Sequence, residues 1–285
     1  MAVFLSEAFT LRRDMDLVSR CKGEGSTTFP FLQRLATVQT RAAAGDSEGE
    51  IASSRPLAGL SAIELGCGAC PLPLMVSAAL GVSTAVATDY LPELVELAES
   101  NLRLNDRTQQ RSCDNHDIRN ASGWSFALSH GFGDSVTPLF DEIWKRKQEG
   151  NVDPHRVTSF DIVLGADITY VPPDIHRKLL ETLIQLTRPK KSVLILSHTT
   201  RNKSQENRFL QRLINDEYQC FTTEHGEMEN SNSTATQGRG PPFELLMICV
   251  DDKEKRWSRY GRQAHNAQKG MVEGETEILI LGRVR

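Results

Sequence analysis

The stretch Ala62–Met75, which reads AIELGCGACPLPLM, determines how the rest of the chain is interpreted. A short apolar run ends in Glu64-Leu65, and Gly66 and Gly68 follow it directly before an apolar, helix-like segment at 72–80. A strand, a glycine turn and a helix N-terminus in this order allow a nucleotide-like ligand to approach bare backbone. Glycines at such turns also serve helix–strand packing, so a purely structural role for this pair stays open at this point.

Strand-like and helix-like segments alternate along the rest of the chain. Apolar strand-like runs alternate with segments of helical periodicity, the strands at 84–88, 160–164 and 192–197 and the helices at 92–105, 174–187 and 205–215. A third strand is expected near Arg111–Ile118, and the last strand candidates are 244–250 and 277–284. This pattern predicts an α/β fold, a Rossmann-like doubly wound, mostly parallel seven-stranded sheet with helices on both faces.

The 285 residues, 39% of them hydrophobic, suit one large domain. Residues 1–55 are predicted to be an N-terminal extension, in which a helix near 30–43 packs on the main domain. That domain is predicted to span residues 56–285, with insertions near 119–158 and 226–274. Cys67 and Cys70 have the spacing of half a zinc site or of a redox pair, but no second pair follows. Small, packable side chains are therefore the favoured interpretation, and no metal is expected.

Charge and hydropathy narrow the classes of partner. The net charge of −4 provides no global basic field, which argues against nucleic acid as a partner. The N-terminus lacks a basic segment before an apolar core, and no apolar run reaches membrane-spanning length. The expectation is a soluble, monomeric, cytoplasmic protein without a membrane partner, with the nucleus as a second compartment.

Acidic residues follow several of the predicted strands. In doubly wound sheets, ligands bind across the carboxyl ends of the strands. Asp89 ends the second strand about 20 residues after the glycine turn, where a carboxylate grips a ribose diol; as an alternative it is a charge at a helix N-terminus. Asp167 follows the fourth strand. Asp117 near the third is either a contact to the ligand's base or a solvated loop acid.

The ligand is predicted by elimination to be S-adenosylmethionine. Pro71 stands where a dinucleotide-binding turn would have a third glycine, and neither a Tyr-x-x-x-Lys pair nor a Gly-Lys-Ser/Thr phosphate loop is present. A dinucleotide-dependent oxidoreductase is therefore disfavoured. S-adenosylmethionine carries a ribose and an adenine but no phosphate, so it requires backbone approach and acids rather than a phosphate-binding loop.

These segments resemble the class I (seven-β-strand) S-adenosylmethionine-dependent methyltransferases, and within them methyltransferase family 16, which is protein-lysine methyltransferase-like. The matching segments are GSTTFPFLQRLA, IELGCGACPLPLM, VATDYLPELVELAESNLRLN and FDIVLGADITYVPPDIHRKLLETL. The most specific is the acid-x-x-aromatic motif Asp167–Tyr170, which that family uses in its active site. Two features depart from the family. Phe29-Pro30 stands where relatives usually have Trp-Pro or Trp-Asp, and Asp117 and Trp124 lie too far apart to be the Asp-Trp pair that often follows the third strand.

The resemblance implies roles for individual residues. Asp167 and Tyr170 would be catalytic, aligning the substrate amine and walling its slot. Cofactor-binding roles fall on residues near the strand ends, namely Glu64, Gly66, Gly68, Asp89, Asp117, Trp124 and Ala166. The implied activity is that of a protein-lysine N-methyltransferase acting on one cytosolic protein, such as a translation factor or a chaperone.

Alternatives remain at this stage. Asp167 could cap the helix after Pro173, with Tyr170 in the core, and His198 could line the site or simply end a strand. The acceptor could be a protein histidine or a small molecule. A non-catalytic cofactor-binding module is a further alternative, against which the intact glycines and strand-end acids argue.

Overall fold

The computed structural model describes residues 29–43, 55–112, 124–149, 156–199, 203–214, 242–250, 258–260 and 276–283. The strands are β1 (Ser61–Leu65), β2 (Thr84–Asp89), β3 (Trp124–Ser129), β4 (Ile162–Ala166), β5 (Val193–Thr199), β6 (Phe243–Val250), β7 (Ser258–Tyr260) and β8 (Thr276–Arg283). The helices are α2 (Pro30–Ala43), α4 (Leu72–Ala79), α5 (Pro92–Ser112), α7 (Val136–Glu149), α8 (Pro173–Leu186) and α9 (Lys203–Ile214).

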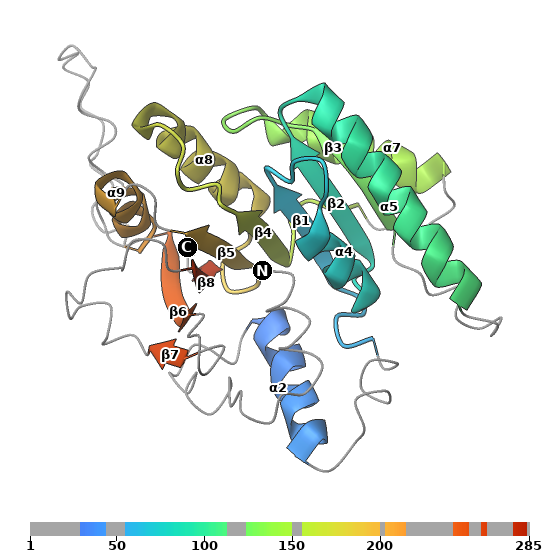
Figure 1. The fold of residues 1–285 in the computed structure, drawn as a ribbon, viewed down its shortest axis with the longest axis horizontal. Coiled ribbons are helices and arrows are strands. Elements are labelled where there is room, and N and C mark those ends of the chain that lie inside the picture. The colour runs from blue at the N-terminus through green and yellow to red at the C-terminus, as the bar shows by residue number, and fades with distance from the viewer. Residues whose placement is uncertain are drawn as a thin grey trace.

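The described strands form one sheet in the order β3-β2-β1-β4-β5-β8-β6-β7. Strands β1 to β5 pair in parallel, whereas β8 pairs antiparallel with β5 and with β6 (Figure 1). The predicted fold class is confirmed, with one more strand than the predicted seven, because the short strand β7 pairs with β6. The strand order reverses between β1 and β4, and a crevice at such a switch point is where doubly wound sheets bind ligands.

Helices cover both faces of the sheet, and the side chains of each strand alternate between them. Alanines line one face of β1 to β3, which allows α4 and α5 to approach closely, and α2 joins the same core (Figure 1). The opposite face carries larger side chains, which pack with α7, α8 and α9. Both faces of the central parallel strands are therefore buried from solvent, as the nearly continuous apolar runs predicted.

The predicted helix near 30–43 is present as α2 and packs on the main domain. Phe29, directly before it, is 1% exposed and lies against Gly282 of β8. A Cβ on Gly282 would stand 2.4 Å from the tip of the Phe29 ring, so a larger residue there would displace the aromatic anchor. The remainder of the predicted 1–55 extension lies outside the described residues. The division of the chain into an extension and a main domain stays a prediction.

The predicted third strand near Arg111–Ile118 is wrong. Residues 111 and 112 continue helix α5, and the strand paired with β2 is β3, at 124–129. Helix α5 runs past its expected end at Asn105, and the apolar centre of β3 is short, so local patterning pointed to the wrong segment. Residues 124–149 of the predicted insertion near 119–158 are thus β3 and α7, which belong to the sheet and its cover.

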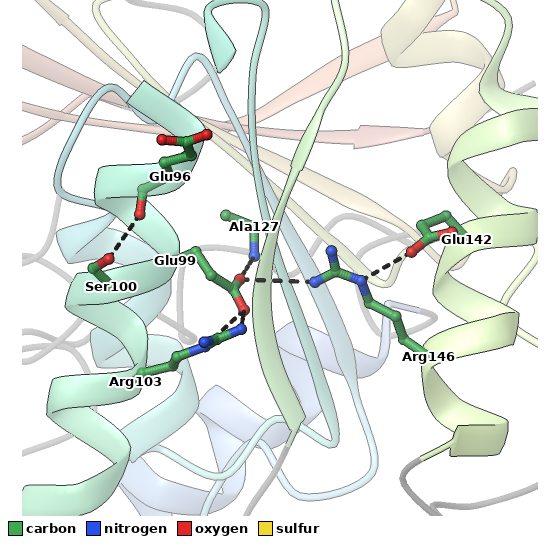
Figure 2. A network of polar contacts seen from close by, with 7 residues as sticks. All are labelled: Glu96, Glu99, Ser100, Arg103, Ala127, Glu142 and Arg146. Atoms are coloured by element: carbon green, nitrogen blue, oxygen red, sulfur yellow. Dashed lines mark hydrogen bonds and ion pairs between the residues drawn. The ribbon is translucent and has the colours of Figure 1, made fainter. Parts of the chain in front are cut away.

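Strand β3 has no described strand on its outer side, and side chains from two helices lie against it (Figure 2). Glu99 of α5 accepts a hydrogen bond of 2.6 Å from the Ala127 amide. Arg146 of α7 reaches the same carboxylate at 3.8 Å, pairs with Glu142 at 3.1 Å and lies over the Phe126 ring. The carboxylate satisfies an edge amide that would otherwise be open to pairing with another chain.

Candidate functional site

Two glycines shape the turn after β1, and they do so for different reasons. Gly66 and Gly68 have φ values of +60° and +59°, in the left-handed region that favours glycine. A Cβ on Gly66 would stand 2.9 Å from Cγ2 of Ile168, whereas a Cβ on Gly68 would have nothing within 4 Å. Packing against Ile168 therefore requires a glycine at position 66, whose predicted contact with the cofactor stays a prediction, and Gly68 leaves space where a ligand can meet the backbone.

Glu64 connects β1 to the helix that follows the turn. Its side chain is 2% exposed, and its Oε2 accepts a hydrogen bond of 2.9 Å from the Leu74 amide in the first turn of α4. Burial raises the pKa of Glu64 to about 8, and the hydrogen bond from Leu74 opposes that rise. Glu64 thus orients the helix N-terminus; its predicted contact with the cofactor's amino group stays a prediction.

Asp89, at the carboxyl end of β2, ties the glycine turn to the next helix. Its Oδ2 accepts from the Gly68 amide at 3.0 Å, and its Oδ1 accepts from the Leu91 amide at 3.1 Å, just before α5. Both interpretations from the sequence therefore remain compatible with the geometry. The carboxylate supports a helix start, and an ionised carboxylate oxygen with one backbone partner can accept a second bond, such as one from a ribose hydroxyl.

The carboxyl end of β3 is occupied by His130 and Phe132 rather than by the residues predicted there. The His130 amide bonds to the Asp89 carbonyl at 2.9 Å, its ring is buried, and its Nε2 has no hydrogen-bond partner in the structure. Burial lowers the pKa of His130, which favours the neutral ring. The tip of the Phe132 ring comes within 3.9 Å of a Cβ built on Gly66. Sequence reasoning missed both, although the run SHGFG directly after apolar FAL was a signal.

The predicted base contacts do not form part of this arrangement. Asp117 lies outside the described residues. Trp124 pairs in register with Thr84 at the amino end of β2, whereas Gly66 and Asp89 lie at the carboxyl ends of their strands. The Trp124 ring lies against Phe126. The prediction that Trp124 contacts a ring of the cofactor is therefore wrong, because Trp124 begins the strand that it was expected to follow.

The Asp167–Tyr170 turn leaves β4 at the same edge of the sheet. Asp167 is half-buried with φ +54°, its amide donates to Ser197 at 2.9 Å, and its Oδ1 accepts from the Thr199 amide at 3.2 Å. Asp is among the few residues that tolerate the left-handed region, because its short polar side chain can bond locally. Ile168 fills the space above Gly165, where a Cβ would stand 2.4 Å from its Cδ1.

Both structural alternatives for this turn are excluded by the geometry. Helix α8 begins at Pro173 after an N-cap at Pro172 that forms no side-chain cap hydrogen bond, so Asp167 does not cap it. Tyr170 is 52% exposed and therefore is not a core residue. Ala166, predicted to offer backbone near the cofactor, is half-buried at the end of β4.

Neither cysteine of the glycine turn has the environment of a reactive thiol pair. Cys67 is buried and Cys70 exposed, both as free thiols, and Cys67 Sγ donates to the Gly68 carbonyl at 3.2 Å. Burial, with the nearby acids Glu64 and Asp89, raises the pKa of Cys67 to about 12. Among the described residues, no group of three or more His, Cys, Asp or Glu could hold a metal ion.

The residues at this edge fit S-adenosylmethionine. Gly68 leaves open space beside the backbone, Asp89 presents carboxylate oxygens to hydroxyl groups, and His130 keeps a buried ring nitrogen without a partner. The Asp89 carboxylate beside the turn suits a ligand with hydroxyl groups rather than phosphates. Residues 64–68, Asp89 and 130–132 would hold such a cofactor, beside the Asp167–Tyr170 turn.

Comparison with known proteins agrees with this assignment. Residues 143–216, which run from α7 to just beyond α9 and include Asp167–Tyr170, match the lysine methyltransferase family. No curated protein matches the chain significantly.

Several solved methyltransferase structures are similar in fold. One is a putative RNA methyltransferase from Pyrococcus horikoshii, with 12% identity over 84% of this chain and 87% of that one, at a TM-score of 0.40. Another is magnesium protoporphyrin IX methyltransferase from Synechocystis PCC 6803, with 12% identity over 99% and 96% and the same TM-score. Likenesses at this level carry no conclusion about substrate. The family match confirms the predicted resemblance over residues 143–216 and with it the enzyme class, a methyltransferase that uses S-adenosylmethionine, while the strand order confirms the fold alone.

Proposed function

We propose that this protein is a protein-lysine N-methyltransferase acting on one specific protein. The observation that carries the proposal is the Asp167–Tyr170 turn, which holds a half-buried carboxylate and an exposed aromatic ring at the edge of the sheet where the glycine turn and Asp89 meet. The lysine methyltransferase match includes this turn and so supports the same nucleophile.

S-adenosylmethionine, when bound, supplies an electrophilic methyl group on a sulfonium sulfur. A lysine amine must lose its proton before it can act as the nucleophile, because its ordinary pKa is about 10.4. The Tyr170 ring would wall the slot and disfavour the hydrated ammonium, which lowers the pKa of the target lysine. Asp167, fixed by the Thr199 amide, would orient the amine and accept a hydrogen bond from it.

The proposed substrate is a folded protein such as a translation factor or a chaperone in the cytoplasm or the nucleus, and the enzyme is proposed to act as a monomer. The family match over residues 143–216 names a lysine methyltransferase but no partner, so the partner is proposed by class alone. None of the helices in the described ranges is long and apolar enough to cross a membrane.

The test is transfer of radiolabelled methyl groups from S-adenosylmethionine into a cell extract from the source organism. We expect one labelled protein band that yields methyl-lysine on acid hydrolysis. Asp167→Ala should abolish the band, and Tyr170→Phe should weaken it. Asp141→Ala is the control: it removes an exposed carboxylate of α7 that pairs with Arg156, and it should leave the band unchanged.

The other acceptor classes are outcomes of the same experiment. Methyl-histidine in the hydrolysate, or label confined to small molecules, would contradict the lysine proposal. Binding of S-adenosylhomocysteine by calorimetry without transfer to any extract would indicate a non-catalytic module. Full transfer by Asp167→Ala would contradict the role proposed for the turn.

A further inference from the structure

A buried polar network lies directly beneath the Asp167–Tyr170 turn. Thr169 Oγ1 and His198 Nδ1 are 2.6 Å apart, and His198 Nε2 lies 3.4 Å from Glu206 Oε2. The three side chains come from the turn, from β5 and from α9, and each is at most 1% exposed. The network therefore joins the turn to two elements that are distant from it in the sequence.

A second histidine holds the same residue of the turn from another side. His176 Nε2 is 2.9 Å from the Thr169 carbonyl, and the ring stacks on Phe209 of α9. Burial lowers the pKa of His176, so the ring is favoured in its neutral form. Both the side chain and the carbonyl of Thr169 are thus fixed, between the half-buried Asp167 and the exposed Tyr170.

Stability alone is a weak reason for this arrangement. Burying a histidine beside a carboxylate requires both groups to lose their hydration, and apolar residues of similar volume at such places are often neutral or stabilising. The clusters around it are apolar, since Phe209, Leu210 and Leu213 of the same helix are buried among leucines and phenylalanines. The polar pair His198 and Glu206 is therefore better explained by its effect on the conformation of the turn, because His198 contacts Thr169 within it.

We propose that His198 and Glu206 are positioning residues that hold Thr169, and through it the left-handed conformation of Asp167, for methyl transfer. Neither touches the substrate or the cofactor. The inference rests on the proposed function in that Asp167 and Tyr170 receive the amine. It goes beyond that function by assigning a role to two buried residues on β5 and α9.

The experiment compares wild-type full-length protein with His198→Leu/Glu206→Leu, which replaces the buried pair with apolar side chains. Amide hydrogen exchange is measured at Asp167 and Thr199, whose amides form the hydrogen bonds between the turn and β5. It is also measured at Gly68, whose amide bonds to Asp89 on the cofactor side. We expect exchange at Asp167 and Thr199 to become about tenfold faster, because losing the contact with Thr169 removes stabilisation of the turn comparable to one hydrogen bond. Exchange at Gly68 should not change. Binding of S-adenosylhomocysteine should stay within about twofold, while labelled methyl transfer falls at least about tenfold.

Two single variants separate positioning from folding. His198→Asn can place an amide near the position of Nδ1 and keep the contact with Thr169, so transfer should fall less than in the double variant. Thr187→Val is the matched control, since it removes a buried threonine hydroxyl that bonds to Leu183 at 2.6 Å at the opposite end of α8, and it should leave transfer and exchange at the turn unchanged.

The inference is overturned if exchange at Asp167 and Thr199 is unchanged in the double variant. It is also overturned if transfer falls only in proportion to the folded fraction. If wild-type protein transfers no label to any extract, the proposed function fails instead, and the exchange readout still decides whether the buried pair positions the turn.

Discussion

The two halves of the site are held in place by different means. On the cofactor side, Asp89 binds the amide of Gly68, 21 residues earlier, and Glu64 binds that of Leu74, 10 residues later. On the acceptor side, Asp167 bonds to residues on β5, Thr199 among them at a separation of 32, and Thr169 bonds to His198 at a separation of 29. Carboxylates that accept from backbone amides hold both halves, but only the second half is also held by a buried pair of side chains, His198 and Glu206, behind Thr169.

This difference shows which half tolerates change. The glycine turn depends on conformations that only glycine adopts readily and on carboxylates within one strand–helix–strand unit. The Asp167–Tyr170 turn depends on the relative placement of β5, α8 and α9. Substitutions in the first half should therefore affect folding and cofactor binding, whereas those behind the second should affect transfer.

The largest effect is expected from Gly66→Ala. Its Cβ would stand 2.9 Å from Ile168, and the backbone has φ +60°, so overpacking adds to strain. The free energy of unfolding should fall by about 2–4 kcal/mol. Gly68→Ala, with the same φ sign but open space, should lose only about 1 kcal/mol while weakening cofactor binding. Urea unfolding of both variants measures this, and equal losses would contradict the division of roles between the glycines.

Asp89→Ala should weaken the cofactor side without affecting the acceptor side. The carboxylate accepts bonds from the Gly68 and Leu91 amides, so its loss removes two charge-assisted contacts and the predicted ribose contact. We expect binding of S-adenosylhomocysteine to weaken by about 10- to 100-fold, the equivalent of about 1.5–3 kcal/mol. Asp167→Ala is the matched comparison and should bind within about twofold of wild type. Calorimetry that finds both variants equally impaired would show that the halves are not separable.

Glu64→Gln should change how stability depends on pH. Because the folded-state pKa of about 8 lies above the ordinary value of 4.5, the native protein holds a proton that the unfolded chain loses between these values. This contribution is complete at low pH and is lost as pH rises towards and through 8. Glutamine keeps an acceptor for the Leu74 amide but does not titrate. Relative to wild type, the variant should gain on the order of 2 kcal/mol between pH 5 and pH 7. The free energy of unfolding is measured by urea denaturation at each pH, and an equal dependence on pH in the two proteins would refute this prediction.

The smallest effect is expected at the edge of β3, the strand that carries His130 at its end. Glu99→Ala removes the acceptor of the Ala127 amide and should cost about 1 kcal/mol of unfolding free energy. Glu142→Ala, which removes only a partly exposed partner of Arg146, should cost less than about 0.5 kcal/mol. Thermal unfolding of the pair tests this, and a larger loss in Glu142→Ala would argue against the edge amide as the important contact (Figure 2).

Much of the fold was predictable from local patterns. The glycine turn after β1, the end of β2 at Asp89 and the α8 helix are encoded in contiguous segments, because apolar periodicity and glycine placement act within a few residues. The third strand was misplaced because a polar segment follows α5 and the apolar centre of β3 is short. Trp124 was consequently expected at the wrong edge of the sheet.

By itself, the sequence determined the doubly wound fold, the glycine turn, the strand-end acids Asp89 and Asp167 and the resemblance to a methyltransferase, since each of these depends on neighbouring residues. Only the tertiary structure decided that Ile168 packs against Gly66 and Gly165, that His130 and Phe132 follow β3 at the site, and that His198 lies between Thr169 and Glu206. Those roles depend on which buried groups meet, and side chains that meet across a sheet and its helices leave no periodic signal along the chain.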